Sequence, residues 1–244
     1  MPHYIYGIVE ANRKPPAVRG IADARLKLVG GDVAAALVSD LPAGEVRLGR
    51  EEMLTHARVL EKALARGTVL PMRFGVVMSD ADEIRERLLD EHAADLRVQL
   101  DEFDGKIEVR IRAVYEEESL LRDVVRADPE IAAVRRSLSG QSEDATYYAR
   151  IQLGERVAAG VERQRERDAD EIIGSLAAVA LAVDEGKTGH ERVAVNASFL
   201  VERARLKEFN DILDAIAEAY AGRVRFKYTG PLPPHSFVQL AGSA

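Results

Sequence analysis

The stretch Val69-Leu70-Pro71-Met72-Arg73-Phe74-Gly75-Val76-Val77-Met78 is the most apolar passage in a sequence otherwise rich in charge. If it is extended, alternate side chains point to opposite faces. Pro71 has no N–H to donate, so we expect the strand to join its sheet at an edge or by its first residues. Gly75 leaves room for another backbone or an aromatic ring. The stretch therefore predicts a core strand, with one bulky apolar face made by Leu70, Met72, Phe74, Val76 and Met78.

Arg73 is the one cation of this stretch, and two interpretations of it stay open. A guanidinium among apolar neighbours is costly to bury unless a carboxylate or backbone carbonyls meet it. In the first interpretation Arg73 is paired inside the sheet core. In the second it is held rigid for a partner protein.

Composition is that of a globular protein and excludes several kinds of site. The 244 residues are 47% hydrophobic and 31% charged, which suits one large domain or two small ones. The net charge of −7 disfavours a general affinity for nucleic acid or anionic membranes. The absence of cysteine excludes disulfides, thiolate metal sites and cysteine nucleophiles. Because no signal peptide and no long apolar run are present, we expect a cytoplasmic protein without a membrane span.

In the first half of the chain, hydrophobic periodicity predicts strands over residues 4–9, 26–29, 33–38 and 107–115. Gly30-Gly31-Asp32 predicts a hairpin turn between the middle two. The helix expected over residues 50–66 has an apolar face of Met53, Leu54, Ala57, Leu60 and Leu64, and Gly67 as its C-terminal cap.

A second helix is expected to run unbroken from its N-cap Asp80 to Phe103, with Glu83 completing a capping box. Its apolar face comprises Ile84, Leu88, His92, Leu96, Leu100 and Phe103. In the following strand Glu108, Arg110 and Arg112 are expected to form the solvated face.

In the second half, the pattern predicts a helical hairpin over residues 116–138 around Asp128-Pro129 and a long helix over 144–183. The charged run 162–171 is interpreted as a solvated helix face, with a partner-binding coiled coil as the alternative. Strands are expected over 193–199, 224–228 and 236–240, with a helix over 206–220.

This order of elements implies an α+β protein whose helices pack on mixed or largely antiparallel sheets. We expect two domains, residues 1–104 and residues 105–244. The second domain then carries a long helical insertion at about 116–183.

The sequence shows no catalytic or ligand-binding motif. Its five histidines are scattered without metal-ligand spacing. Phosphate-binding loops, nucleophile elbows and zinc-protease motifs are also absent. We therefore expect no enzyme, metal, cofactor or small-molecule substrate, although catalytic groups need not be neighbours in sequence.

The segment from Tyr228 to Phe237 stands out because three of its residues, Pro231, Pro233 and Pro234, are prolines within four positions. Such a segment is stiff and extended. It is interpreted either as a rigid turn that sets the register of the final strand or as an exposed docking edge with a low entropy cost.

These motifs, taken in order, resemble the gas vesicle GvpF/GvpL family. The resemblance covers nearly the whole chain and is carried by residues 4–9, 69–75, 100–111, 197–201 and 229–238. The sequence departs from the family where tryptophan is frequent, at Val109 and Leu232, and where tyrosine is frequent, at His235. The glycine and proline framework is intact.

The resemblance implies an accessory protein of gas vesicle formation whose C-terminal domain is a modified ferredoxin-like fold. The implied partners are the hydrophobic shell protein GvpA and other Gvp accessory proteins, without nucleic acid or membrane, and the implied location is cytoplasmic and gas vesicle-associated. A chaperone-like role is the main hypothesis. The alternatives are a nucleation scaffold or minor vesicle component, and a small-molecule-binding or enzymatic ferredoxin-like domain. The candidate partner-binding residues are Pro71, Arg73, Phe74, Gly75, Pro231, Pro233, Pro234 and Phe237.

Overall fold

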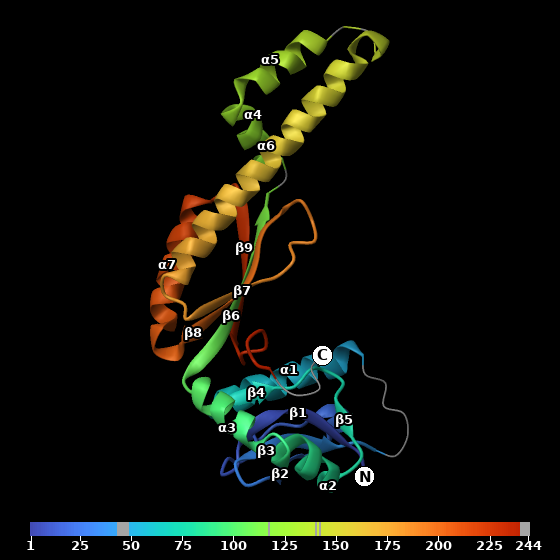
Figure 1. Ribbon diagram of the computed structural model, residues 1–244, viewed down its shortest axis with the longest axis vertical. Helices are drawn as coiled ribbons and strands as arrows, with labels where there is room; N and C mark the ends of the chain where they lie inside the picture. The colour runs from blue at the N-terminus through green and yellow to red at the C-terminus, as the bar shows by residue number, and fades with distance from the viewer. Residues whose placement is uncertain (43–48, 117, 140, 142, 240–244) are drawn as a thin grey trace. The chain divides into compact units, whose positions relative to one another are not determined.

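The computed structural model describes residues 1–42, 49–116, 118–139, 141 and 143–239, and it shows an α+β protein with two sheets (Figure 1). The predicted fold class is confirmed. The chain divides into two compact units. Unit 1 comprises Met1–Val109, Leu200–Ala204 and Thr229–Ala244, and unit 2 comprises Arg110–Phe199 and Arg205–Tyr228. The division into domains 1–104 and 105–244 stays a prediction.

Unit 1 contains a sheet in the order β2-β3-β1-β4, with β5 also paired to β1. Its strands are β1 (His3–Glu10), β2 (Leu26–Gly30), β3 (Ala34–Asp40), β4 (Val69–Pro71) and β5 (Val77–Met78). All its pairings are antiparallel, including the predicted β2–β3 hairpin. From Tyr4 to Val9 every residue of β1 is buried, because the strand lies between neighbours on both sides and is covered on both faces.

The 3₁₀ turn η1 (Ile21–Asp23) precedes the hairpin, and helix α1 (Arg50–Leu64) lies on one face of the sheet. The predicted apolar face of α1 is partly wrong. Its buried residues are His56, Val59, Leu60, Ala63 and Leu64, whereas Met53 and Leu54 are 54% and 62% exposed and Ala57 is also exposed. The reason is that His56 bonds to a tyrosine of β1 and turns inward in place of Met53.

On the other face lie α2 (Ala81–Glu83), the π-helical segment η2 (Ile84–Asp90) and α3 (Ala93–Glu102). The predicted unbroken helix is wrong, since the Glu91 N–H bonds to the Glu86 carbonyl five residues back and the helix breaks before α3. The Asp80 cap is confirmed, because its carboxylate accepts from the N–H groups of Asp82 and Glu83. Glu83 accepts from the Ser79 N–H and not from that of Asp80.

The second sheet has the order β7-β8-β6-β9. Its strands are β6 (Lys106–Tyr115), β7 (Ala182–Glu185), β8 (Val193–Glu202) and β9 (Val224–Leu232). The remaining helices are α4 (Ser119–Ala127), α5 (Pro129–Leu138), α6 (Glu143–Ala177), the 3₁₀ turn η3 (Arg203–Arg205) and α7 (Leu206–Ala219). The predicted hairpin of α4 and α5 is confirmed, with the Asp128 carboxylate accepting from the Glu130 N–H.

Two predicted ends are wrong. Helix α6 ends at Ala177, and the strand β7 begins before the predicted helix end at residue 183. The pattern did not indicate this strand, because β7 lies at the edge of its sheet, is only partly buried and shows no alternation of apolar residues. The last strand, predicted over 236–240, is not formed by residues 236–239, while Leu240 lies outside the described residues. Instead β9 continues to Leu232, and Phe237 and Val238 donate their N–H groups to the Pro234 carbonyl in a turn.

The charged run of α6 is not wholly solvated, because Asp168 is only 3% exposed. Its carboxylate accepts hydrogen bonds from the hydroxyls of Tyr115, at 2.6 Å, and Tyr220, at 3.2 Å, and from the Gln164 amide at 3.0 Å. The Arg223 guanidinium lies 3.6 Å away. The carboxylate thus joins α6 to β6 and to the end of α7 within unit 2.

Replacing Asp168 with alanine should lower the free energy of unfolding by about 3 kcal/mol, because the buried Tyr115 hydroxyl loses its acceptor and Arg223 loses a carboxylate. The Tyr220 hydroxyl keeps an acceptor in Glu171, at 2.9 Å.

The neighbouring Asp170 is exposed, so Asp170→Ala should change stability by less than about 0.5 kcal/mol. Urea unfolding of both variants measures the difference. Equal midpoints for the two variants would contradict the role given to Asp168.

Candidate protein-binding surface

The central stretch is not one strand, which corrects the prediction. Strands β4 and β5 are separated by a turn over residues 72–76 (the central turn), where the Met72 N–H bonds to the Tyr6 carbonyl and the Ile5 N–H to the Val76 carbonyl. The turn arises because Gly75 adopts a φ of +97°, a left-handed conformation that suits glycine. The alternation therefore ends at Met72, which is buried, and Arg73 is exposed.

A buried cluster of rings holds the central turn. The Tyr4 hydroxyl lies 2.9 Å from His56 Nδ1 and accepts the Gly75 N–H at 3.0 Å. The Phe74 ring packs edge-on against His56, with ring centroids 5.8 Å apart. Tyr6 extends the cluster, since its hydroxyl bonds to the Ser39 hydroxyl and accepts the Ile21 N–H.

Electrostatics keep this cluster neutral. The pKa of His56 is lowered to about 4, mainly by burial and to a smaller extent by the nearby His235. A hydrogen bond with the Met72 backbone raises the pKa but does not outweigh these two effects. Burial also raises the pKa of Tyr4 to about 12. At neutral pH both groups are therefore uncharged, and the Tyr4–His56 contact is a hydrogen bond between neutral partners.

The proline-rich segment 229–237 (the tail) is fixed by Glu108. Glu108 is fully buried, which contradicts its predicted place on a solvated face. The reason is that its carboxylate accepts the Ser236 N–H at 2.7 Å and the Ser236 hydroxyl at 3.1 Å. Arg110 and Arg112 are exposed as predicted.

Beyond the tail, the side-chain amide of Gln99 exchanges two hydrogen bonds with the backbone of Gln239. The half-buried Phe237 ring lines a groove of about 450 Å³ beside α3, together with Val98 and Phe103. The groove also carries the carboxylates of Asp95 and Glu102.

The structure therefore brings the two predicted motifs to one residue. Phe74 of the central turn packs on His56, and His235 of the tail is near enough to His56 to shift its pKa. Of the candidate residues, Arg73, Gly75 and Pro231 are exposed, Phe74 and Phe237 are half-buried, and Pro71, Pro233 and Pro234 are buried. Arg73 has no hydrogen bond or ion pair to any residue that the structure describes.

The sequence did not predict the residues that fix the central turn and the tail, above all Tyr4, His56 and Glu108. The buried tyrosine, histidine and carboxylate give no periodic signal of their own. The one available indication was Tyr4 in a strand apolar on both faces, where a hydroxyl needs a partner.

Among the residues that the structure describes, no group of three or more histidines or carboxylates is arranged to hold a metal ion. Likewise, none of their helices is long and apolar enough to cross a membrane.

Comparison with known proteins assigns the chain to a protein family. The family model described as gas vesicle synthesis protein GvpL/GvpF matches residues 2–239. The chain belongs to this GvpL/GvpF family. A gas vesicle protein F from Streptomyces sp. (strain CB03234) is 37% identical over 246 residues, which cover 98% of this chain and 100% of that protein. A gas vesicle protein L1 from Halobacterium salinarum is 25% identical and covers 98% of this chain and 91% of its own length.

Two crystal structures share the fold. GvpF from Anabaena sp. PCC7120 has a TM-score of 0.85 at 22% identity, and GvpF from Microcystis aeruginosa has a TM-score of 0.80 at 23% identity. Each alignment covers 98% of this chain and 99% of the other. Membership of the GvpL/GvpF family places the chain in gas vesicle formation, together with other gas vesicle proteins.

The buried His56 should make folding stability depend on pH. Because its pKa is about 4 when folded and about 6.5 when unfolded, the unfolded chain binds more protons between these values. Stability should therefore fall as the pH drops from about 6.5 to 4, by up to about 3 kcal/mol from this residue.

Urea unfolding between pH 7 and pH 4 tests this, with His56→Asn as the comparison. The variant is expected to be less stable at pH 7 but to lose less stability on acidification. A variant with the same pH slope as the original chain would show that His56 does not titrate in this way.

Proposed function

We propose that this chain binds the hydrophobic shell protein GvpA during gas vesicle assembly, in a chaperone-like manner, through the central turn and the tail. The observation that supports the proposal most is Arg73. It is exposed and unpaired in the described part of the chain, yet its neighbours Phe74 and Gly75 are fixed to buried groups. An arginine on a rigid support is a frequent anchor in protein interfaces.

Apolar surface near this position in the sequence supports the same role. Val77, just after the central turn, is 42% exposed, and Met53 and Leu54 on the first turns of α1 are more exposed still. Strand β4 lies at the end of its sheet, but Val69, Leu70 and Pro71 are buried, so the proposed contact uses these exposed apolar side chains and not the strand edge. Exposed apolar groups of an unassembled shell subunit would be covered by such contacts.

The candidate residues divide by role in this proposal. Arg73, Phe74, Gly75, Pro231 and Phe237 contact the partner, and Pro71, Pro233 and Pro234 are buried and hold the backbone that presents them. Preordered loops bind without a large entropy cost. The net charge of −7 keeps the complex dispersed.

Co-expression with the shell protein, followed by pull-down and a solubility assay, tests the proposal. The original chain should keep the shell protein soluble and co-purify with it. Arg73→Glu should reduce the co-purified amount about tenfold, since loss of a central interface arginine costs on the order of 1–2 kcal/mol or more. Phe237→Ala should act in the same direction.

Arg97→Glu is the matched control, because Arg97 is an exposed arginine of the same unit that is not among the candidate residues, and the change in charge is the same. Unchanged thermal unfolding must accompany each variant. If folded Arg73→Glu and Phe237→Ala retain the shell protein as well as Arg97→Glu does, this surface assignment is wrong. If the original chain does not bind the shell protein but floats with vesicles, the scaffold or minor-component role replaces the chaperone-like one.

A further inference from the structure

Unit 1 has a groove between helix α3 and the tail (the α3 groove). Its volume of about 450 Å³ lies within the usual range for a binding pocket, so whole side chains fit into it. Val98 and Phe103 contribute apolar surface from the α3 side, and Phe237 contributes it from the tail. Because Val98 is 63% exposed, a large apolar side chain is available to a partner in this wall.

Both walls of the α3 groove are fixed by the fold. Helix α3 is anchored by its buried residues Leu96 and Leu100. The tail is held by the bonds from Ser236 to Glu108 that are described above. The Gln99 amide also joins the two walls, since it donates to the Gln239 carbonyl at 2.9 Å and accepts the Gln239 N–H at 3.0 Å. A partner therefore meets an ordered groove, which lowers the entropy cost of binding.

The α3 groove is negatively charged. Asp95 and Glu102 line it and are exposed, and neither carboxylate has an ion pair or hydrogen bond to the residues in the described ranges. The described residues that line the groove include no cation that could offset them. Two carboxylates are therefore available to positive groups of a partner.

The spacing of these residues along α3 indicates the shape of the partner. Val98 is three positions after Asp95 and four before Glu102, so the three side chains lie on one side of the helix. The carboxylates are thus about 10 Å apart along the helix axis, with Val98 between them. A second helix has the same repeat. It matches this pattern if an apolar residue has a lysine or arginine one turn before it and one turn after it.

From these observations we infer that the α3 groove binds a basic amphipathic helix of a partner protein. An apolar side chain of that helix covers Val98 and Phe237, and its flanking cations pair with Asp95 and Glu102. The carboxylates repel a nucleic acid, and a polyamine would leave the apolar side chains uncovered. The inference deepens the proposed function, because it names the kind of segment that contacts Phe237, and it rests on that function only for the partner's identity.

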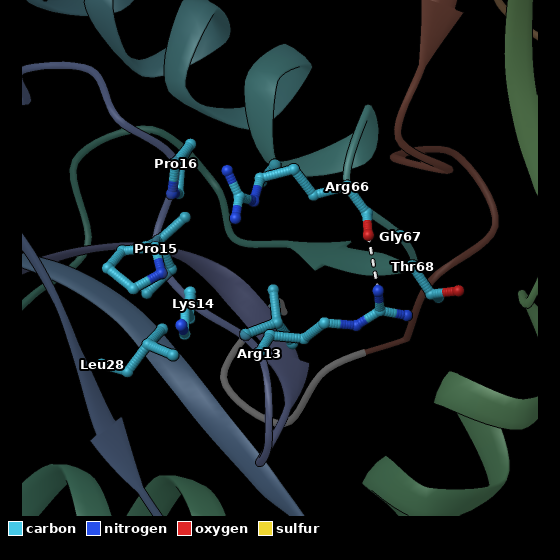
Figure 2. Close-up of a pocket in the computed structure, with 11 residues that line it drawn as sticks. Arg13, Lys14, Pro15, Pro16, Leu28, Arg66, Gly67 and Thr68 are labelled. Atoms are coloured by element: carbon cyan, nitrogen blue, oxygen red, sulfur yellow. Dashed lines mark hydrogen bonds between the residues drawn. The ribbon is translucent and has the colours of Figure 1, made fainter.

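A second pocket of unit 1, beside the end of α1, does not offer such a site. Figure 2 shows Arg13 and Arg66 there, with Pro16 nearby. Arg13 is already held by the Glu10 carboxylate and the Arg66 carbonyl. The cavity volume is about 10 Å³, which is room for about one water molecule. No side chain of a partner fits there, whereas the α3 groove has both the volume and the unpaired charge.

Titration of the full ¹⁵N-labelled chain with synthetic peptides tests the inference by NMR. The probe is Ala-Ala-Lys-Ala-Ala-Leu-Ala-Ala-Ala-Lys-Ala-Ala with blocked ends (the lysine peptide). It should shift the amide signals of Val98, Gln99 and Phe237 with a Kd below about 1 mM. A peptide with glutamate in place of both lysines should bind at least about tenfold more weakly. A peptide with alanine in place of leucine should bind at least about fivefold more weakly, because it buries less apolar surface.

Variants of α3 test the two carboxylates. Asp95→Lys and Glu102→Lys should each weaken the lysine peptide at least about fivefold, and the double variant should prefer the glutamate peptide. Asp101→Lys is the matched control, since Asp101 is exposed on the same helix but does not line the groove. A circular dichroism spectrum like that of the original chain shows that each variant is folded.

The inference is overturned if the lysine peptide causes no shifts at several millimolar, or if Asp101→Lys weakens it as much as Glu102→Lys does. Equal affinity for the glutamate peptide, the alanine peptide or spermidine overturns it as well, because the groove would then not require both the charge and the apolar side chain. Pull-down of the shell protein separates this inference from the proposed function. If the original chain binds the lysine peptide but not the shell protein, only the proposed function is wrong, and the reverse result overturns only the inference.

Discussion

The hydroxyl of Tyr4 connects three segments of unit 1 that are far apart in sequence. It accepts the Gly75 N–H at 3.0 Å and lies 2.9 Å from His56 Nδ1. Because one lone pair is used by Gly75, the hydroxyl proton is free to point at the histidine, which then accepts it as a neutral ring. A buried polar group that loses its partner costs on the order of 1–3 kcal/mol, so strand β1, helix α1 and the central turn are fixed together by this one group.

The contact with Tyr4 also favours the neutral form of His56, the residue that lies beside both the central turn and the tail. A protonated imidazole has no acceptor nitrogen for the Tyr4 hydroxyl. Burial and the nearby His235 both oppose that protonation. The central turn packs on the ring through Phe74, and the tail approaches it through His235. One neutral histidine thus lies against the central turn and near the tail.

The sequence contained the pattern of elements but not the polar contacts that position them. Alternation located β6 correctly, and continuous apolar runs located β1 and β3, whose residues are nearly all buried. The buried residues of β2, Leu26 and Val29, do not alternate, so this strand was located by the turn that joins it to β3. Alternation failed over residues 72–76, where the positive φ of Gly75 interrupts an apolar run that is typical of a strand. It also failed at Glu108 and Asp168, because a charged residue indicates solvent until its partners, here Ser236 and Tyr115, are known.

The candidate partner-binding residues stay a prediction, and the contacts that hold them in place could not be predicted from the sequence. Arg73 and Phe74 were selected from their place in an apolar stretch, yet the choice between a buried and an exposed Arg73 required the turn that exposes it. His56 was passed over in favour of Met53, since helical spacing ranks an apolar residue above a histidine as the buried one. Only the Tyr4 hydroxyl, from a strand 52 positions away in sequence, reverses that choice.

Arg73 combines an unpaired charge with an ordered backbone. It has no partner in the described part of the chain, and the next two residues, Phe74 and Gly75, are fixed to His56 and Tyr4. An unpaired surface cation adds little to folding, but on ordered backbone it can bind a carboxylate with a smaller loss of conformational entropy. The proposed contact with a partner protein therefore rests on Arg73, because the fold itself gains little from this cation.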